Sequence, residues 1–278
     1  MSTELASIWS GFVDDAAIFP PGDVPLHEAT AAYGARTTEE GAALVGSFVL
    51  RDTDLPLVRG FGGPLSVVIT GGAGQVMGPA GLCRKLGLDL AGLEIALRDL
   101  DDLAGNARRV VAAVDEALSE GVLDDEIPVY VELPGEAAAS WLAAADEVAG
   151  LGLRLKFRTG GLDADAFPTS ATLAAWIDAA LDRETSFKCT AGLHRALRHT
   201  GDDGFEHHGF VNVLFATARA FAGEPPEEVV ATLEERDGQA FFAEVTPELG
   251  KARRWFTSFG SCSVSEPWSD LRAMGLVS

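Results

Sequence analysis

Cysteine and long apolar runs are scarce in this sequence. The 278 residues contain three widely spaced cysteines, Cys83, Cys189 and Cys262. This odd number and wide spacing argue against a disulfide framework or a zinc ribbon and are typical of a protein from a reducing cytoplasm. No apolar stretch approaches the ~18 residues that cross a bilayer, and the first ten residues lack the basic and apolar regions of a signal peptide. We therefore predict a cytoplasmic protein that does not bind membranes.

Positive charge is also scarce. Lysine and arginine total 21 against 42 aspartate and glutamate residues, which gives a net charge of −21. A charge of this size repels nucleic acid at long range, and we predict no nucleic-acid partner. Only four of the basic residues are lysine. A chain that otherwise uses arginine is expected to retain lysine where an amine is needed, which directs attention to Lys156 and Lys188.

Short strand-like runs alternate with alanine-rich helical stretches, the pattern of a parallel α/β fold. The predicted strands are residues 13–19, 44–50, 64–70, 92–98, 127–133, 152–158, 185–191 and 208–214. The predicted helices are residues 26–36, 75–86, 101–120, 135–149, 168–182, 214–222 and 226–236. Eight such strands favour a single (β/α)8 TIM-type barrel, which typically needs about 250 residues. An open, doubly wound sheet remains the alternative, because periodicity cannot show closure.

We expect one domain over residues 1–278, with the barrel core at residues 13–222. Residues 223–278 contain an acidic helix followed by a segment rich in aromatic and small residues. They are predicted to form a C-terminal extension, a helix and a tail that pack over one end of the barrel.

Charged and apolar residues alternate along four of the predicted strands. In one of them Lys156 lies opposite Leu155 and Phe157, and the same alternation holds around Glu94, Glu132 and Lys188. Helices cover the outer face of a barrel, so the charged rows should point inward and pair with one another. Active sites of such barrels lie at the carboxyl ends of the strands, where these residues fall. The pattern favours a functional pocket over a salt-bridged plug.

Two neighbouring lysines have a chemical consequence. An amine beside another cation is harder to protonate, so its pKa falls towards neutrality and it can attack a carbonyl group. This is the requirement for Schiff-base catalysis. Cations at this end of the barrel would also attract a substrate carboxylate or phosphate.

Four segments resemble the class I deoxyribose-phosphate aldolases, a family of (β/α)8 barrels. LKFRTGG (155–161) and FKCTAGLH (187–194) are similar to the two lysine strands of that family. VDDAAIFPPGDVPLHEA (13–29) resembles its first, aspartate-containing strand, and LEIALRDLDDLAGN (93–106) resembles its fourth strand and the following turn.

The resemblance implies a role for each matching residue. Lys156 would be the Schiff-base nucleophile and Lys188 the neighbour that lowers its pKa. Glu94 stands where the family has an aspartate of the proton relay, and Asp14 stands where its first strand carries another. Glu132, from the charged row of its own strand, is a further candidate for moving protons. The expected substrate-binding residues around them are Arg158, Thr159, Gly160, Thr190 and His194, of which His194 is also placed to act as a general acid or base.

Departures from the family bear on the substrate. Glu94 is one methylene longer than the aspartate, and Arg158 replaces a small polar residue. The segments after the seventh and predicted eighth strands, AGLHRALRH and HHGFVNV, are not the small-residue turns that hold phosphate in the family. The sequence therefore predicts a substrate other than deoxyribose phosphate, with Arg158 available to bind a carboxylate.

The leading hypothesis is an aldolase-like lyase that acts on a small carbonyl substrate with an anionic group, without a cofactor. The first alternative is a non-catalytic barrel that binds small anions or serves in assembly. The second is a metal-dependent isomerase or hydrolase with Glu94, Glu132, His194 and His208 as ligands. Lysines beside a divalent cation would oppose its binding, so we expect no metal. The sequence does not decide between a monomer and a homo-oligomer.

Overall fold

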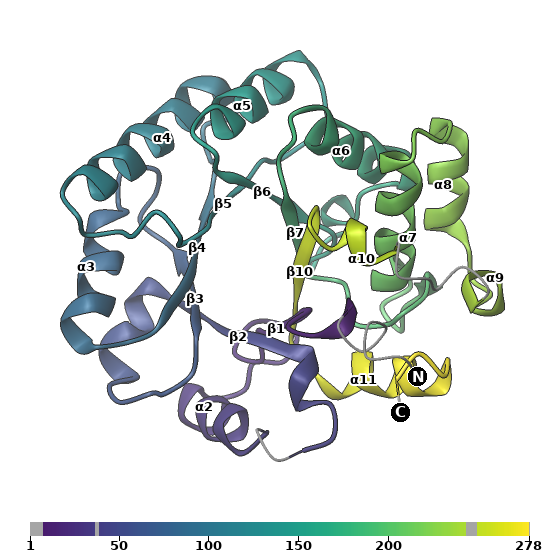
Figure 1. The fold of residues 1–278 in the computed structure, drawn as a ribbon, viewed down its shortest axis with the longest axis horizontal. Helices are drawn as coiled ribbons and strands as arrows, with labels where there is room; N and C mark the ends of the chain where they lie inside the picture. The colour runs from purple at the N-terminus through teal and green to yellow at the C-terminus, as the bar shows by residue number, and fades with distance from the viewer. Residues whose placement is uncertain (1–7, 37–38, 243–248, 278) are drawn as a thin grey trace.

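Eight parallel strands close into a barrel in the computed structural model, which describes residues 8–36, 39–242 and 249–277 (Figure 1). Each strand pairs with its sequence neighbour from β1 to β7, and β10 closes the ring between β7 and β1. The predicted (β/α)8 TIM-type barrel is therefore confirmed. The strands are β1 (Val13–Asp15), β2 (Val45–Arg51), β3 (Leu65–Ile69), β4 (Leu90–Ala96), β5 (Val129–Glu132), β6 (Arg154–Arg158), β7 (Phe187–Thr190) and β10 (Phe256–Ser261).

Helices surround the barrel on its outer side (Figure 1). Two of them begin at side chains that satisfy free backbone N–H groups: Asp102 accepts from Gly105 at 2.8 Å, and Thr169 accepts from Thr172 at 3.1 Å. The helices are α2 (Leu26–Ala35), α3 (Met77–Leu86), α4 (Leu103–Ser119), α5 (Ala139–Gly150), α6 (Ser170–Asp182), α7 (Phe210–Phe221), α8 (Pro226–Glu234), α9 (Gln239–Phe242), α10 (Leu249–Ala252) and α11 (Ser265–Ala273). Shorter elements are the 3-10 turns η2 (Ala42–Leu44), η3 (Asp52–Leu57) and η4 (Ala164–Ala166), and the hairpin strands β8 (His199–Thr200) and β9 (Glu206–His207).

The apolar core lies between the barrel wall and the helices. Phe157 of β6 packs against Trp141 of α5 and Trp176 of α6, with ring centroids 6.4 and 5.4 Å apart. All three side chains are buried. The apolar half of the alternation in β6 therefore faces outward, which leaves the opposite half, with Lys156, to face the barrel interior.

The predicted position of the eighth strand was wrong. Residues 208–214 do not form a strand, since α7 begins at Phe210, and the eighth strand is β10 at residues 256–261. This strand lies inside the segment predicted as a C-terminal tail, so residues 223–278 complete the barrel and the core does not end at residue 222.

Both halves of this error have a physical cause. A short apolar run cannot be told from a buried helix by periodicity, and α7 is buried over its first eight residues. Strand β10 carries serine, threonine and glycine because its inner face meets polar groups: Ser258 donates a hydrogen bond to Asp14 at 2.7 Å. A strand with a polar inner face lacks the apolar signal by which strands are recognised.

The remaining expectations concern cysteines and membranes. All three cysteines are free thiols, as predicted. Within residues 8–36, 39–242 and 249–277, no helix is both long and apolar enough to cross a bilayer. Residues 1–7, on which the expected absence of a signal peptide depends, lie outside the described residues.

Candidate active site

The two lysines of the sequence pattern meet inside the barrel. Lys156 of β6 and Lys188 of β7 are direct partners in the parallel register of these adjacent strands. Both side chains are buried, with 4% of Lys156 and 1% of Lys188 exposed. Isolated charges at this depth would be strongly disfavoured, so each ammonium group needs a partner.

Glu94 of β4 supplies a partner to both lysines. Its Oε2 atom lies 2.7 Å from Nζ of Lys156, and its Oε1 atom lies 2.6 Å from Nζ of Lys188. One carboxylate thus bridges two ammonium groups. The two amines and this glutamate, which the sequence assigned to a common site, are brought together.

Two further carboxylates complete the network. Glu132 of β5 lies 3.0 Å from Nζ of Lys156 and accepts a hydrogen bond from Nε of Arg158 at 2.7 Å. Asp14 of β1 lies 2.7 Å from Nζ of Lys188. Three carboxylates therefore face three cations, the two buried lysines and the exposed Arg158, so the charges of the network balance.

Serines that the sequence reading missed hold Asp14 in place. Asp14 accepts hydrogen bonds from the backbone N–H of Ser47 at 3.1 Å and from its hydroxyl at 2.7 Å. The Ser47 hydroxyl also lies 2.6 Å from that of Ser66, and Ser258 donates to Asp14 from the other side. All three serines are buried. Single serines in strands carry no pattern that would reveal this role before the fold is known.

The carboxylates outweigh the expected effect of one lysine on the other. Burial lowers the pKa of Lys156, but Glu94 and Glu132 outweigh burial, and the net pKa lies above its ordinary value. Lys188 does act to lower this pKa, as predicted, but its effect is smaller than theirs. The same balance raises the pKa of Lys188 through Asp14 and Glu94. The expectation that the pKa of Lys156 falls towards neutrality is therefore wrong.

The carboxylates respond in the opposite sense. Burial raises the pKa of Glu94, but the two lysines outweigh it and lower the value to about 2. Burial also opposes ionisation of Glu132, whose pKa is nevertheless lowered by Lys156 and Arg158. At neutral pH the site therefore rests with its lysines protonated and these glutamates ionised.

A cavity of about 500 Å³ lies against this network at the carboxyl ends of the strands. Of the predicted catalytic residues, Lys156, Lys188 and Glu94 line it. Asp14 and Glu132 do not line the cavity. Asp14 contacts Lys188, and Glu132 contacts Lys156. Of the predicted substrate-binding residues, three line the cavity: Arg158, Thr190 and His194.

The other two predicted substrate-binding residues, Thr159 and Gly160, join the loops after β6 and β7. The Thr159 hydroxyl donates to the carbonyl oxygen of Ala191 at 2.5 Å. A Cβ atom on Gly160 would lie 2.8 Å from Cα of Gly192, so the two backbones approach as closely as glycine permits. Their contacts fix the shape of the loops and do not reach the cavity.

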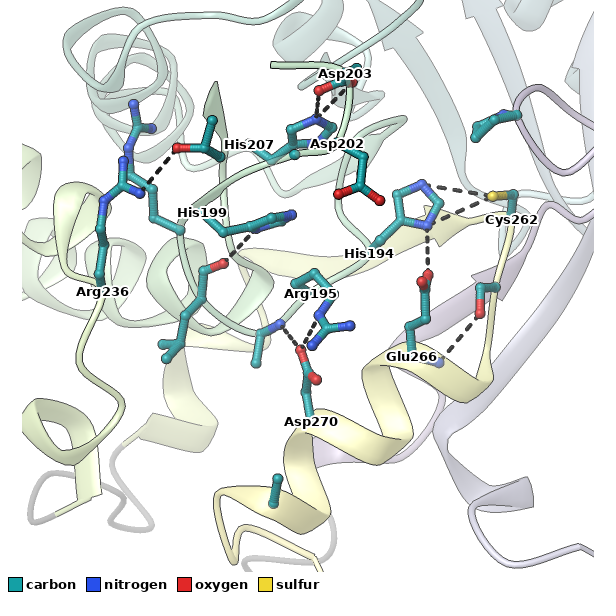
Figure 2. Close-up of a pocket in the computed structure, with 18 of the residues that line it drawn as sticks. His194, Arg195, His199, Asp202, Asp203, His207, Arg236, Cys262, Glu266 and Asp270 are labelled. Atoms are coloured by element: carbon teal, nitrogen blue, oxygen red, sulfur yellow. Dashed lines mark hydrogen bonds and ion pairs between the residues drawn. The ribbon is translucent and has the colours of Figure 1, made fainter. Parts of the chain in front are cut away.

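His194 stands between this cavity and a neighbouring pocket of about 960 Å³, because it lines both. Figure 2 shows its imidazole between Glu266 and Cys262. Nδ1 lies 3.3 Å from Oε2 of Glu266, and the Cys262 sulfur lies 3.7 Å from Nδ1 and 3.8 Å from Nε2. A sulfur nearly equidistant from both nitrogens is not aligned with either one, and burial raises the pKa of this thiol to about 11. The thiol is therefore not activated as a nucleophile.

The charge of His194 depends on Glu266. Burial lowers the pKa of the imidazole, and Glu266 partly opposes this. We expect the imidazole to be neutral at pH 7 and able to accept or donate a proton, while contributing no positive charge to anion binding.

Replacing Glu266 by glutamine should lower the pKa of His194 further, because the variant keeps the shape but removes the charge that favours the imidazolium. Proton NMR titration of the imidazole, assigned by its loss in His194→Gln, measures this pKa directly. The exposed Glu116→Gln change serves as the control and should leave the titration unchanged. An unchanged or higher pKa in Glu266→Gln would show that the two side chains do not interact in solution.

The four suggested metal ligands do not converge. Within the described residues, no group of three or more histidine, cysteine, aspartate or glutamate side chains could hold a metal ion. His208 is fully buried away from solvent, where its ring nitrogens lie 3.1 Å from Nη1 of Arg198 and 2.9 Å from the carbonyl oxygen of Pro168. The metal-site hypothesis therefore lacks its geometric basis.

The sequence matches no protein-family model and no curated protein. A barrel of this kind supports many unrelated reactions, so the fold by itself does not assign one. By its architecture, the chain is a (β/α)8 TIM barrel.

Proposed function

We propose that the protein is an aldolase-like lyase in which Lys156 forms a Schiff base with a small carbonyl substrate that carries an anionic group. The observation that carries this proposal is the bridging of Lys156 and Lys188 by Glu94 at the wall of one cavity. Carbonyl addition needs an amine, a nearby base to take its proton and room for the substrate. Lys156 has Glu94 and Glu132 as possible bases and lines the cavity. The resemblance to the class I deoxyribose-phosphate aldolases supports the same reading, because Asp14, Glu94, Lys156 and Lys188 belong to one ion-pair network.

Lys156 is the better nucleophile of the two lysines. It is the more exposed, and one of its partners, Glu132, is shared with Arg158. Lys188 is enclosed by Asp14 and Glu94, and the ring of Tyr130 lies 5.3 Å from its Nζ atom. Lys188 therefore acts as a fixed charge beside the reacting amine.

The carboxylates allow a protonated resting lysine to react. Glu94 or Glu132 accepts one proton from Lys156, and the free amine adds to the carbonyl carbon. The oxygen takes up this proton and a second one from the amine nitrogen, leaves as water, and an iminium ion remains on the lysine. This ion carries the same charge as the ammonium group that it replaces, so the carboxylates at 2.7 and 3.0 Å stabilise it as well.

Cleavage of the substrate then needs a base. The iminium ion takes up the electron pair of the breaking carbon–carbon bond, while the hydroxyl group on the β-carbon loses its proton. His194 lines the cavity and can accept that proton, with Glu266 orienting its ring.

Arg158 is the candidate for holding the anionic group. Its side chain is exposed at the cavity, and it donates a hydrogen bond to Glu132 through its Nε atom. The terminal guanidinium nitrogens can bind a carboxylate or a phosphate. The proposal covers both anions, because the prediction against phosphate relied on AGLHRALRH (191–199) and on HHGFVNV (207–213) as the end of the eighth strand. The true eighth strand, β10, ends in Gly260 and Ser261 and is followed by Cys262, all small residues.

Reductive trapping tests this proposal. The protein is mixed with acetaldehyde, pyruvate or dihydroxyacetone phosphate, reduced with borohydride, and its intact mass is measured. We expect one stable adduct with at least one of these compounds in the wild type and in Lys85→Arg, which changes an exposed lysine, but none in Lys156→Arg. Equal adduct formation in all three proteins would reject the assignment of Lys156.

Complete pairing of the cluster favours a second candidate, a barrel that binds small anions without chemistry. Such a protein would give no adduct, although phosphate or a small carboxylate would raise its melting temperature. Replacement of Lys156 would leave this stabilisation unchanged if Arg158 alone bound the anion.

A further inference from the structure

The cavity has a charged floor and an apolar rim. Lys156, Lys188 and Glu94 form the floor, and Arg158 lies at the end of the same strand as Lys156. The rim consists mainly of apolar side chains on the loops that follow β1, β6 and β7, with the polar residues Asp203 and His207 beside them. Its apolar members are Phe19, Pro20, Pro21, Leu162, Phe167 and Phe205.

The rim residues come from separate parts of the chain. Phe167 and Phe205 follow different strands and meet with their ring centroids 5.0 Å apart. Phe19 follows β1, and the guanidinium group of Arg51 lies 4.6 Å from its ring centroid. All three rings remain only partly buried. One apolar stretch of sequence therefore does not account for this surface; three loops bring it together above the lysines.

Leu162 adds an unusual exposed side chain to the rim. It is 74% exposed, although it lines the cavity. Covering exposed apolar surface with a ligand is favourable, because it removes that surface from water. Against Leu162 and the phenylalanine rings, the hydroxyl groups of a polyhydroxylated substrate would lack hydrogen-bond partners, and an apolar group would need none. The polar lining residues Asp203 and His207 are paired with each other at 3.0 Å.

We infer that the substrate carries an aromatic or bulky apolar group on the carbon beyond the bond that is cleaved; this inference rests on the proposed Schiff-base lyase. In the cleavage direction such a β-hydroxy carbonyl compound yields an aromatic aldehyde and the enamine on Lys156. In the reverse direction the enamine carbon attacks the aldehyde carbon, the aldehyde oxygen takes up a proton, and water releases the product from the lysine. A donor such as pyruvate places its carboxylate near Arg158 and leaves the rim to the aldehyde.

The test uses the reverse reaction. Acetaldehyde, pyruvate and dihydroxyacetone phosphate serve as donors, and Lys156 adducts are first measured by borohydride trapping. Benzaldehyde and glycolaldehyde are then compared as acceptors with whichever donor forms the adduct. We expect kcat/KM to be about ten-fold or more higher for benzaldehyde, since pockets distinguish apolar groups by factors of this size.

Two matched variants locate the effect. Leu162→Ser should lower kcat/KM for benzaldehyde by about three- to ten-fold and leave glycolaldehyde unaffected, because the variant removes apolar contact alone. Leu57→Ser is the control, since Leu57 is also 74% exposed but does not line the cavity. An adduct on Lys156 together with equal or better use of glycolaldehyde overturns this inference and leaves the proposed lyase intact. Equal losses in the two leucine variants overturn it as well. The absence of an adduct with all three donors rejects both.

Discussion

The Lys156→Arg variant is expected to fold normally and to lose the proposed lyase activity by about 10⁴-fold or more, the scale seen when a covalent nucleophile is removed. Arginine keeps a positive charge between Glu94 and Glu132, so the buried carboxylates retain a partner. Its guanidinium group stays protonated and cannot add to a carbonyl. The measurement is kcat/KM with the carbonyl compound that gives a trapped adduct, together with the melting temperature of each protein.

This comparison separates chemistry from structural support. Lys85→Arg makes the same change at an exposed position and should retain wild-type kcat/KM. If Lys156→Arg retained more than about a tenth of the wild-type activity, a residual far above that of a lost nucleophile, the lysine would be a structural charge.

Replacement of Glu94 by glutamine is expected to have the largest effect on stability. The variant leaves Lys156 and Lys188 buried with one carboxylate each, where the wild type gives each lysine two. Breaking a buried ion pair by removing one partner costs about 3–5 kcal/mol. Urea unfolding at pH 7 should show a loss of this order, whereas Glu116→Gln on the exposed face of α4 should change stability by less than about 0.5 kcal/mol.

The pH dependence gives this prediction a definite sign. The folded-state pKa of Glu94 is lowered from 4.5 to about 2, so its ionisation stabilises the fold above pH 4.5. This contribution is lost as the pH falls from 4.5 towards 2. The stability difference between wild type and Glu94→Gln should therefore shrink over that range. A difference that stays constant between pH 7 and pH 3 would contradict the ion-pair account.

The faces of the strands could be predicted from sequence because strand periodicity is strict. In β6, Leu155 and Phe157 alternate with Lys156 and Arg158, and this pattern alone separates the helix-covered face from the interior. The same rule applied to β4, β5 and β7 brought Glu94, Glu132 and Lys188 to the interior. Convergence at one end then follows from the parallel arrangement of the strands.

Features that depend on three-dimensional distance could not be predicted in this way. The sequence shows two lysines, but their pKa values depend on which carboxylates lie within 3 Å, and Glu94 is about sixty residues before the first of them. Strand β10 was missed because Ser258 and Gly260 lack apolar side chains. Glu266 was missed because its relevance to His194 arises only when α11 packs beside the loop after β7 (Figure 2).

The most direct measurement is peptide mapping of the wild-type protein after borohydride reduction in the presence of the trapped carbonyl compound. Our account predicts that the added mass lies on the peptide containing Lys156. A control sample that is reduced without the carbonyl compound should show no added mass. An adduct confined to Lys85, Lys251 or the amino terminus would contradict it, because these amines react without any help from the buried carboxylates.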